Sequence, residues 1–140
     1  MFEDKKLIVK LGKSQIDLLI EEARKMFPVE ICGALFGCFS DGEAIIRKIV
    51  HLRNTLNSCV AFQIDPEEFL VELIRAENEG LRHIGFFHSH PSSTEPSKMD
   101  IKFMRLWPKS IWLIISLVSY EIAAYTIVNG KVCDVYIKIV

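Results

Sequence analysis

GFFHSHPSSTEPSKMD, residues 85–100, is the stretch around which the fold of this chain is predicted. The apolar run Ile84–Phe87 leads into it and is typical of a buried strand. If the strand continues, His88 and His90 stand two residues apart, so both imidazoles project from the same face of the sheet. Pro91 ends the strand because it has no N–H group for the ladder.

A carboxylate follows at a distance that allows it to return to the histidines. Six residues separate His90 from Ser97, which opens a predicted helix with Asp100 in its first turn. Three protein ligands of nitrogen and oxygen type leave one open position on a tetrahedral zinc, as in catalytic zinc sites. We therefore predict that His88, His90 and Asp100 bind one zinc ion per chain, although the same ligands also suit iron or manganese.

Ser97 and Asp100 also fit a simpler role. A serine at the N-cap with an acidic residue three positions on is a helix-start signature that requires no metal. The side-chain hydroxyl of Ser97 could also donate a hydrogen bond to the oxyanion of a reacting carbonyl. The two roles use different groups of one serine, so both remain open.

The length and composition of the chain limit the classes of function that it can have. A chain of 140 residues forms one domain, residues 1–140, with room for a substantial core. Its net charge of -1 shows no basic excess, so we expect no nucleic-acid partner. The apolar run Ile111–Val118 is too short to span a bilayer, and the charged start MFEDKKLIVK lacks a signal-peptide core. We therefore expect a cytoplasmic protein with no membrane partner.

The cysteines show no metal-binding or redox spacing. None of the four forms a C-x-x-C pair. Their apolar or strand-like surroundings favour buried free thiols. The four are Cys32, Cys38, Cys59 and Cys133.

The flanking chain alternates between helical and strand-like patterns. We expect strands at 7–10, 29–37, 43–52, 61–64, 84–90, 111–117, 122–128 and 131–139, and helices from Ser14 to Phe27, Asp65 to Gly80 and Ser97 to about Arg105. No run of βαβ units appears. The predicted fold is therefore α/β in the α+β sense, a mixed or antiparallel sheet flanked by helices. His83, at the start of the central strand, is expected to be solvated.

Hydrolysis by a metal-activated water also requires a base. Glu30 lies at the entrance of an otherwise apolar strand, where burial would raise its pKa toward neutrality. Acids at strand entrances are usually solvated, so the prediction that Glu30 is catalytic depends on its burial. Ser89 should point away from the two histidines and supply a supporting hydrogen bond.

Taken together, these residues resemble the signature of the JAMM metalloproteases, also called the MPN+ family. That signature is a glutamate, then His-Ser/Thr-His-Pro, then Ser-x-x-Asp. Here it is matched by Glu30, His88–Pro91 and Ser97–Asp100. The segments Pro28–Gly37 and Phe62–Pro66 are similar to the family's glutamate-bearing strand and its entry to the second helix.

The resemblance implies a fold, a cofactor and an activity. The fold would be the JAMM/MPN fold, similar to that of cytidine deaminases. His88, His90 and Asp100 would bind zinc, Glu30 would hold the metal-bound water as general acid/base, and Ser97 would stabilise the oxyanion. Members of the family hydrolyse the bond after the C-terminus of ubiquitin or ubiquitin-like modifiers.

Two departures refine this expectation. The family usually has seven residues between the second histidine and the serine, whereas this chain has six. Little sequence lies between Asp100 and the next strand, where larger members carry an insertion, so the chain resembles a compact prokaryotic or archaeal form.

Its expected partners are small archaeal modifiers, sulfur-carrier proteins and their conjugates, and an apolar strand face could form a homodimer contact. The alternatives are a peptidase that processes a sulfur-carrier precursor and a non-catalytic MPN scaffold.

Overall fold

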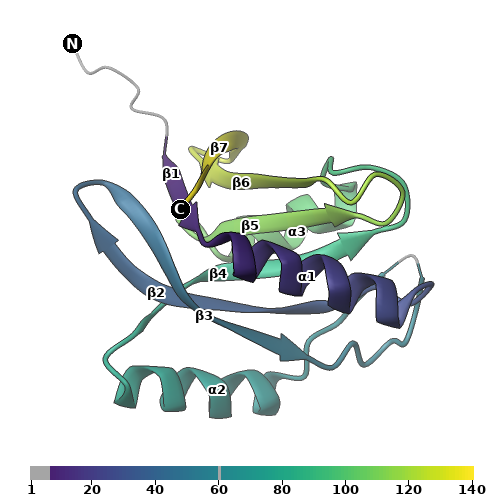
Figure 1. Cartoon of the computed structure of the whole chain (residues 1–140), viewed down its shortest axis with the longest axis horizontal. Coiled ribbons are helices and arrows are strands. Elements are labelled where there is room, and N and C mark those ends of the chain that lie inside the picture. Colours follow the sequence, from purple (N-terminus) through teal and green to yellow (C-terminus); the bar gives the residue numbers. More distant parts are fainter. Residues whose placement is uncertain (1–6, 60) are drawn as a thin grey trace.

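The computed structural model describes residues 7–59 and 61–140. Seven strands and three helices follow one another in these ranges (Figure 1). Their bounds are β1 (Ile8–Leu11), α1 (Lys13–Met26), β2 (Cys32–Ser40), β3 (Glu43–Leu52), α2 (Pro66–Asn78), β4 (Arg82–His90), α3 (Lys98–Leu106), β5 (Ile111–Ser116), β6 (Ile122–Val128) and β7 (Lys131–Ile139).

The strands form one mixed sheet that closes into a barrel in the order β1-β3-β2-β4-β5-β6-β7. β4 and β5 are parallel, and β1 is parallel to both of its neighbours, β3 and β7. The other four pairs are antiparallel. The mixed sheet flanked by helices is as predicted. Closure of the sheet was not predicted, because the hydrophobic pattern of the four-residue β1 does not identify its partners.

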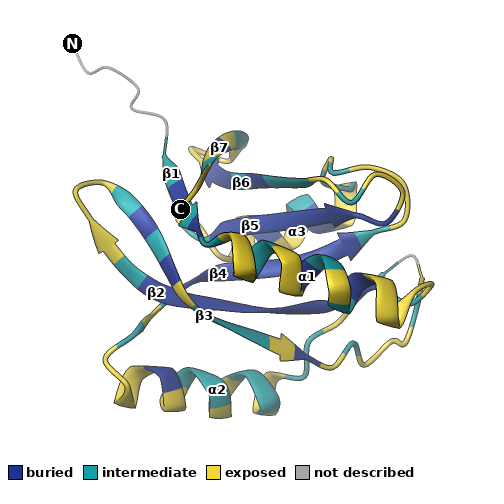
Figure 2. Cartoon of the chain, in the orientation of Figure 1, coloured by how far each residue is buried: buried dark blue, intermediate teal, exposed yellow. Residues whose placement is uncertain are grey.

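Helices cover two separate apolar faces of the sheet (Figure 1). Leu19 and Ala23 of α1 belong to one buried cluster, with alternate residues of the strands such as Phe87. Ala76 of α2 and Met104 of α3 belong to the other. Figure 2 shows that β4 and β5, between these layers, are buried along most of their length. The two central strands are therefore rigid supports for the residues at their carboxyl ends.

Close backbone approach explains a glycine in the central strand. A Cβ on Gly85 would lie 1.7 Å from the carbonyl oxygen of Ile111 on β5. No side chain fits at that distance, so glycine permits the pairing of β4 with β5.

The starts of two predicted elements and one predicted strand were wrong. α1 begins at Lys13 instead of after Ser14, because Gln15 Oε1 accepts the Gly12 N–H at 2.9 Å and caps the helix earlier. β2 begins at Cys32 instead of Val29. The stretch 61–64 is not a strand; its only ladder contact among the described residues is an isolated bridge from Ile64 to Asn54.

His83 is packed among aromatic rings instead of being solvated. Its ring centroid lies 4.7 Å from that of Phe86 and 5.5 Å from that of Trp107. Nε2 of His83 is 2.8 Å from the carbonyl oxygen of Gly85. Burial lowers the pKa of this imidazole. A strand-end position did not reveal these contacts, because two of them come from distant segments, from Phe69 of α2 and from Trp107 directly after α3.

The cysteines are free thiols, but only one is buried. Cys32 is fully enclosed, Cys38 and Cys133 are half-buried, and Cys59 is exposed. The prediction of burial therefore holds for Cys32 and is wrong for Cys59.

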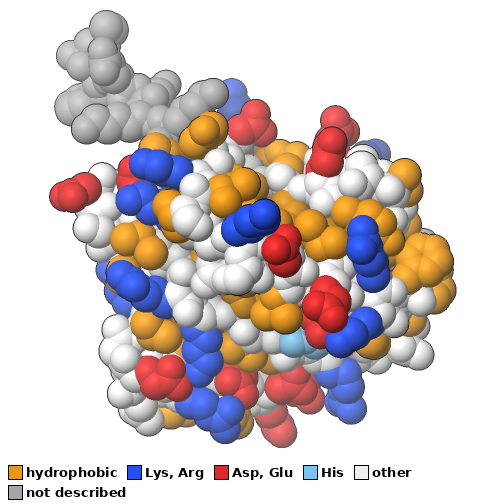
Figure 3. Space-filling view, viewed as in Figure 1, with side chains coloured by type: hydrophobic (Ala, Val, Ile, Leu, Met, Phe, Trp, Pro, Cys, Tyr) orange, Lys and Arg blue, Asp and Glu red, His pale blue; other side chains and the backbone are white. Residues whose placement is uncertain are grey.

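On the face shown in Figure 3, acidic and basic side chains are interspersed with apolar ones, and neither kind of charge forms a patch. Among the described residues, no helix has both the length and the apolar character needed to cross a membrane.

Candidate metal centre

The carboxyl end of β4 and the first turn of α3 bring three potential metal ligands together. Oδ2 of Asp100 lies 3.2 Å from Nε2 of His88 and 3.4 Å from Nε2 of His90. The ligand atoms of the three residues all lie within 4.8 Å of one another. The alternation of β4 and the cap of α3 therefore place the predicted ligands where one cation could contact all of them.

The surroundings of these ligands fit a metal ion. Both ring nitrogens of His88 and Nδ1 of His90 are buried and have no well-formed hydrogen bond to any described residue. Burial opposes ionisation of Asp100, but His88 and His90 outweigh it and hold the pKa of this carboxyl well below its usual range. An ionised carboxylate beside unpartnered imidazole nitrogens is a donor set suited to zinc.

Ser97 is the N-cap of α3. Its Oγ accepts the Asp100 N–H at 3.0 Å, and Oδ2 of Asp100 accepts the Ser97 N–H at 2.8 Å. This reciprocal capping box confirms the simpler role and also fixes the carboxylate in place. Because the hydroxyl of Ser97 accepts in this contact, its own hydrogen remains able to donate.

Glu30 is buried, as its predicted role requires. Glu30 is only 2% exposed, and its Oε2 has no hydrogen-bond partner among the described residues. Burial raises the pKa of Glu30 to about 7, with the charge of His90 opposing this and that of Asp100 adding to it. A carboxyl group with a pKa near neutrality can both accept and return a proton.

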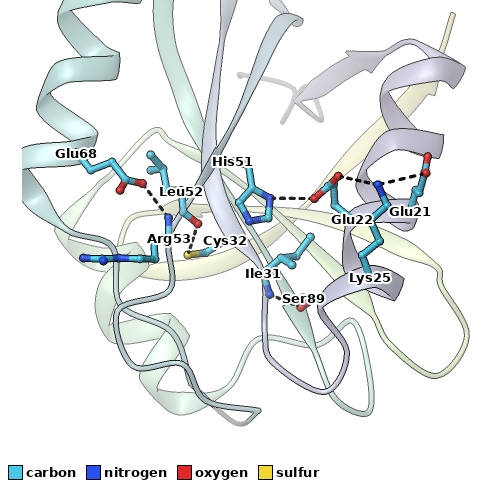
Figure 4. A network of polar contacts seen from close by, with 10 residues as sticks. All are labelled: Glu21, Glu22, Lys25, Ile31, Cys32, His51, Leu52, Arg53, Glu68 and Ser89. Carbon is cyan, nitrogen blue, oxygen red and sulfur yellow. Dashed lines mark hydrogen bonds and ion pairs between the residues drawn. The ribbon is translucent and has the colours of Figure 1, made fainter.

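Ser89 supports the chain next to Glu30 from the opposite face of β4. Its Oγ accepts the Ile31 N–H at 2.8 Å, and its own N–H donates to the Ile31 carbonyl at 3.0 Å (Figure 4). The predicted supporting hydrogen bond is thereby confirmed. It links the strand that carries the histidines to the residue that follows the glutamate.

Sequence reasoning missed two residues near the centre. The ring of Phe62 stacks on the imidazole of His88, with centroids 4.5 Å apart. The side chain of Asn54 donates to the Glu30 carbonyl at 3.1 Å. Both come from the irregular segment between β3 and α2, where no periodic pattern indicates which side chains point inward. A lone asparagine before a turn was the only signal.

An apolar pocket of about 240 Å³ adjoins His88 through Phe62. Aromatic rings make up much of its wall, and Trp112 contributes a buried indole N–H without a partner among the described residues. The lining residues come from the segment before α2, from α2, and from α3, β4 and β5; they include Phe62, Phe69, Phe86, Phe103, Trp107 and Trp112.

Two curated relatives match part of the chain. One is a desampylase from Pyrococcus furiosus, 46% identical over 89 residues, which are 63% of this chain and 60% of that protein. The other is a desampylase from Haloferax volcanii, 33% identical over 89 residues, 64% of this chain and 63% of that protein. The match thus spans less than two thirds of the length of either relative.

Solved structures match nearly the whole chain. A Desulfitobacterium hafniense protein of known solution structure superposes with a TM-score of 0.85 at 27% identity, covering 94% of this chain and 92% of that one. A JAB1/MPN domain protein from Archaeoglobus fulgidus shares the fold with a TM-score of 0.57 at 19% identity, covering 95% and 98%. The family model for prokaryotic homologs of the JAB domain matches residues 12–128. The chain therefore belongs to the Prok-JAB family, the prokaryotic homologs of the JAB domain.

Proposed function

We propose that this protein is a zinc-dependent isopeptidase or peptidase that hydrolyses the bond after the C-terminus of a ubiquitin-like modifier. The observation that carries the proposal is the convergence of His88, His90 and Asp100, with the pKa of the buried Glu30 carboxyl influenced by the charges of His90 and Asp100. The desampylase activity named for the two relatives, which would remove a small archaeal modifier from its targets, supports this class of substrate.

The proposed roles follow from the chemistry of each group. His88, His90 and Asp100 would hold one zinc ion, which would supply Lewis-acid chemistry and would lower the pKa of a water molecule at the site. Glu30 takes the proton from the attacking water as the oxygen bonds to the carbonyl carbon. Ser97 donates a hydrogen bond to the developing oxyanion. Glu30 then passes its proton to the leaving lysine amine as the C–N bond breaks.

The electrostatics of Glu30 support its assignment as the proton carrier. An exposed glutamate is a weak base, because its pKa of 4.5 leaves little tendency to accept a proton at neutral pH. In the metal-free chain burial raises the pKa of Glu30 to about 7, which brings its proton affinity closer to that of the water it must deprotonate. A non-catalytic scaffold would need neither three converging donors nor this buried carboxyl.

The test is cleavage of isopeptide-linked conjugates made with the ubiquitin-like modifiers of Pyrococcus furiosus and Haloferax volcanii. Wild type should release the modifier and stop when a chelator removes the metal. Glu30→Gln should keep its zinc and lose about 10²- to 10⁴-fold in kcat. Glu77→Gln, an exposed position on α2, is the matched control and should cleave like wild type. Zinc-loaded wild type that releases no modifier would refute the proposal.

A further inference from the structure

Glu30 lies outside the sheet, two residues before the first residue of β2. β2 begins at Cys32, so the sheet ladder does not include the peptide groups of Glu30. Its buried carboxylate oxygen Oε2 lacks a hydrogen bond to any described residue. The position of the carboxyl group therefore depends on how the backbone at Glu30 is anchored.

Both backbone hydrogen-bonding groups of Glu30 are bound by the segment between β3 and α2. The Glu30 N–H donates to the carbonyl of Ser58 at 2.9 Å. The Glu30 carbonyl accepts from Nδ2 of Asn54 at 3.1 Å. The described residues of this segment, 54–59 and 61–64, thus replace the strand partner that Glu30 lacks on that side. On the other side, Ser89 plays the equivalent part for Ile31.

Asn54 uses its full hydrogen-bonding capacity in this arrangement. Its Nδ2 also donates to the Ala61 carbonyl at 3.0 Å. Its Oδ1 accepts the N–H groups of Leu56 at 3.1 Å and Gln63 at 3.2 Å. An amide has two donors and two acceptor sites, and here each faces a group of matching polarity, which fixes its orientation. Neither Asp nor Ala can reproduce all four contacts.

Closure of the segment does not by itself require Asn54. Thr55 already joins the two ends, because its N–H and its Oγ1 donate to the Gln63 carbonyl at 2.9 Å and 3.1 Å. What Asn54 adds is a second link from the closed segment to Glu30, at its carbonyl, beside the one that the Ser58 carbonyl makes to its N–H. The same segment carries Phe62, whose ring stacks on His88. One folded segment therefore contacts both the proposed base and a proposed metal ligand.

We propose that Asn54 is a positioning residue for Glu30, one that sets the place of the carboxyl group relative to His90 and Asp100. This inference rests on the proposed function. Asn54 acts through the backbone of Glu30, because its side chain bonds only to main-chain groups, those of Glu30, Ala61, Leu56 and Gln63 among the described residues. A displacement of a catalytic group by about 1 Å can lower a rate about 100-fold, so loss of this link should reduce turnover while leaving the three metal ligands in place.

Two variants of Asn54 separate its link to Glu30 from its part in the segment. Asn54→Asp keeps oxygen acceptors for Leu56 and Gln63 but loses both donations, including the one to Glu30. Asn54→Ala removes all four contacts. Thr55→Val is the matched control, because it removes a side-chain hydrogen bond that closes the same segment without contacting Glu30. Each variant is measured as the zinc-loaded full chain.

The readouts are kcat, KM, zinc content and hydrogen exchange of the Glu30 amide, with conjugates of the Pyrococcus furiosus and Haloferax volcanii modifiers as substrates. Asn54→Asp and Asn54→Ala should lower kcat about 10- to 100-fold, as losses of supporting hydrogen bonds around metal sites do. Their KM should stay within about twofold and their zinc content should equal that of wild type. The Glu30 amide should exchange faster in both, but not in Thr55→Val.

Each outcome bears on the inference. A kcat for Asn54→Asp close to that of wild type, or an equal loss in Thr55→Val, would overturn it. Unfolding of both Asn54 variants would overturn it too, since it would assign the residue to stability. If wild type cleaves no conjugate, the proposed function fails. The hydrogen-exchange rate of the Glu30 amide then tests by itself whether Asn54 positions Glu30. Faster exchange in Asn54→Asp but not in Thr55→Val supports this role of Asn54, and unchanged exchange overturns it.

Discussion

Replacing Glu30 by glutamine should stabilise the metal-free protein in a pH-dependent way. The pKa of Glu30 is raised from 4.5 to about 7, chiefly by burial. Below pH 4.5 the carboxyl is protonated in both the folded and unfolded states, so folding stability is unaffected. Between pH 4.5 and 7 the unfolded chain releases the proton while the folded protein retains it. Stability therefore falls as the pH rises through this window and is fully reduced above pH 7.

The size of this effect on folding stability follows from the shift in the pKa of Glu30. Each pKa unit corresponds to about 1.4 kcal/mol, so ionised Glu30 should destabilise the folded state by about 3 kcal/mol at pH 8. Glutamine has no charge to desolvate, so the variant avoids this loss. For a chain of this length the difference corresponds to about 10 °C in Tm. The stability gap between Glu30→Gln and wild type should be small at pH 5 and near its full size at pH 8.

The assay is urea unfolding of wild type and Glu30→Gln at both pH values in the presence of a chelator. The change in the stability gap between pH 5 and pH 8 isolates the ionisation of Glu30, because any packing change caused by glutamine contributes equally at both pH values. Adding zinc should narrow the gap at pH 8, since a nearby cation favours the carboxylate. A gap of the same size at pH 5 and pH 8 would refute the argument that Glu30 is desolvated.

Three further predictions concern the supports of the candidate centre. Ser89→Ala leaves the buried Ile31 N–H without its acceptor and should lower the free energy of unfolding by about 1–3 kcal/mol, measured by urea titration. Gly85→Ala places a Cβ against the Ile111 carbonyl and should destabilise the fold by more than about 3 kcal/mol, visible as a large fall in Tm. Asp100→Asn removes the only carboxylate among the three proposed ligands and should abolish stoichiometric zinc binding, measured by metal analysis after dialysis.

Matched variants show whether these effects are specific. Ser93→Ala alters an exposed serine that caps a loop turn and should leave stability within about 0.5 kcal/mol of wild type. At Gly12 an added Cβ would meet its nearest neighbour at 3.6 Å, so alanine there should be far milder than at Gly85. Asp17→Asn, on α1, should retain zinc. Equal effects in a variant and its control would contradict the corresponding prediction.

The parts of the centre that could be predicted from sequence are those set by local rules. The two-residue spacing of His88 and His90 follows from the pleat of a strand, and the Ser97–Asp100 cap follows from the geometry of a helix start. The apolar neighbours of Glu30 left both a buried and a solvated side chain open, and the structure shows that it is buried. For the histidine pair and the helix cap, a short segment contains all the information needed.

The parts that could not be predicted depend on contacts between distant segments. Asn54 reaches Glu30 across 24 positions of sequence, and the half-buried His83 packs against aromatic side chains from α2 and from the residue that follows α3. No periodicity marks residues 61–64, so β-branched and aromatic content alone suggested a strand there. The partners of β1 are likewise set by the completed sheet and not by its own four residues.

The pairing of β1 has a consequence for the order of folding. Ile8 pairs with Tyr136 of β7, close to the other end of the chain, and with Glu43 of β3. Closing so long a loop costs more chain entropy than closing the shorter loops between the other paired strands, and β7 is synthesised after the other strands of the described residues. The hairpin of β2 and β3 and its pairing with β4, which together support the candidate centre, join residues that lie closer together in the sequence and can form earlier. The strand that is synthesised first is therefore expected to find its final place last, and until then β3 and β7 expose edges on which newly made chains could associate.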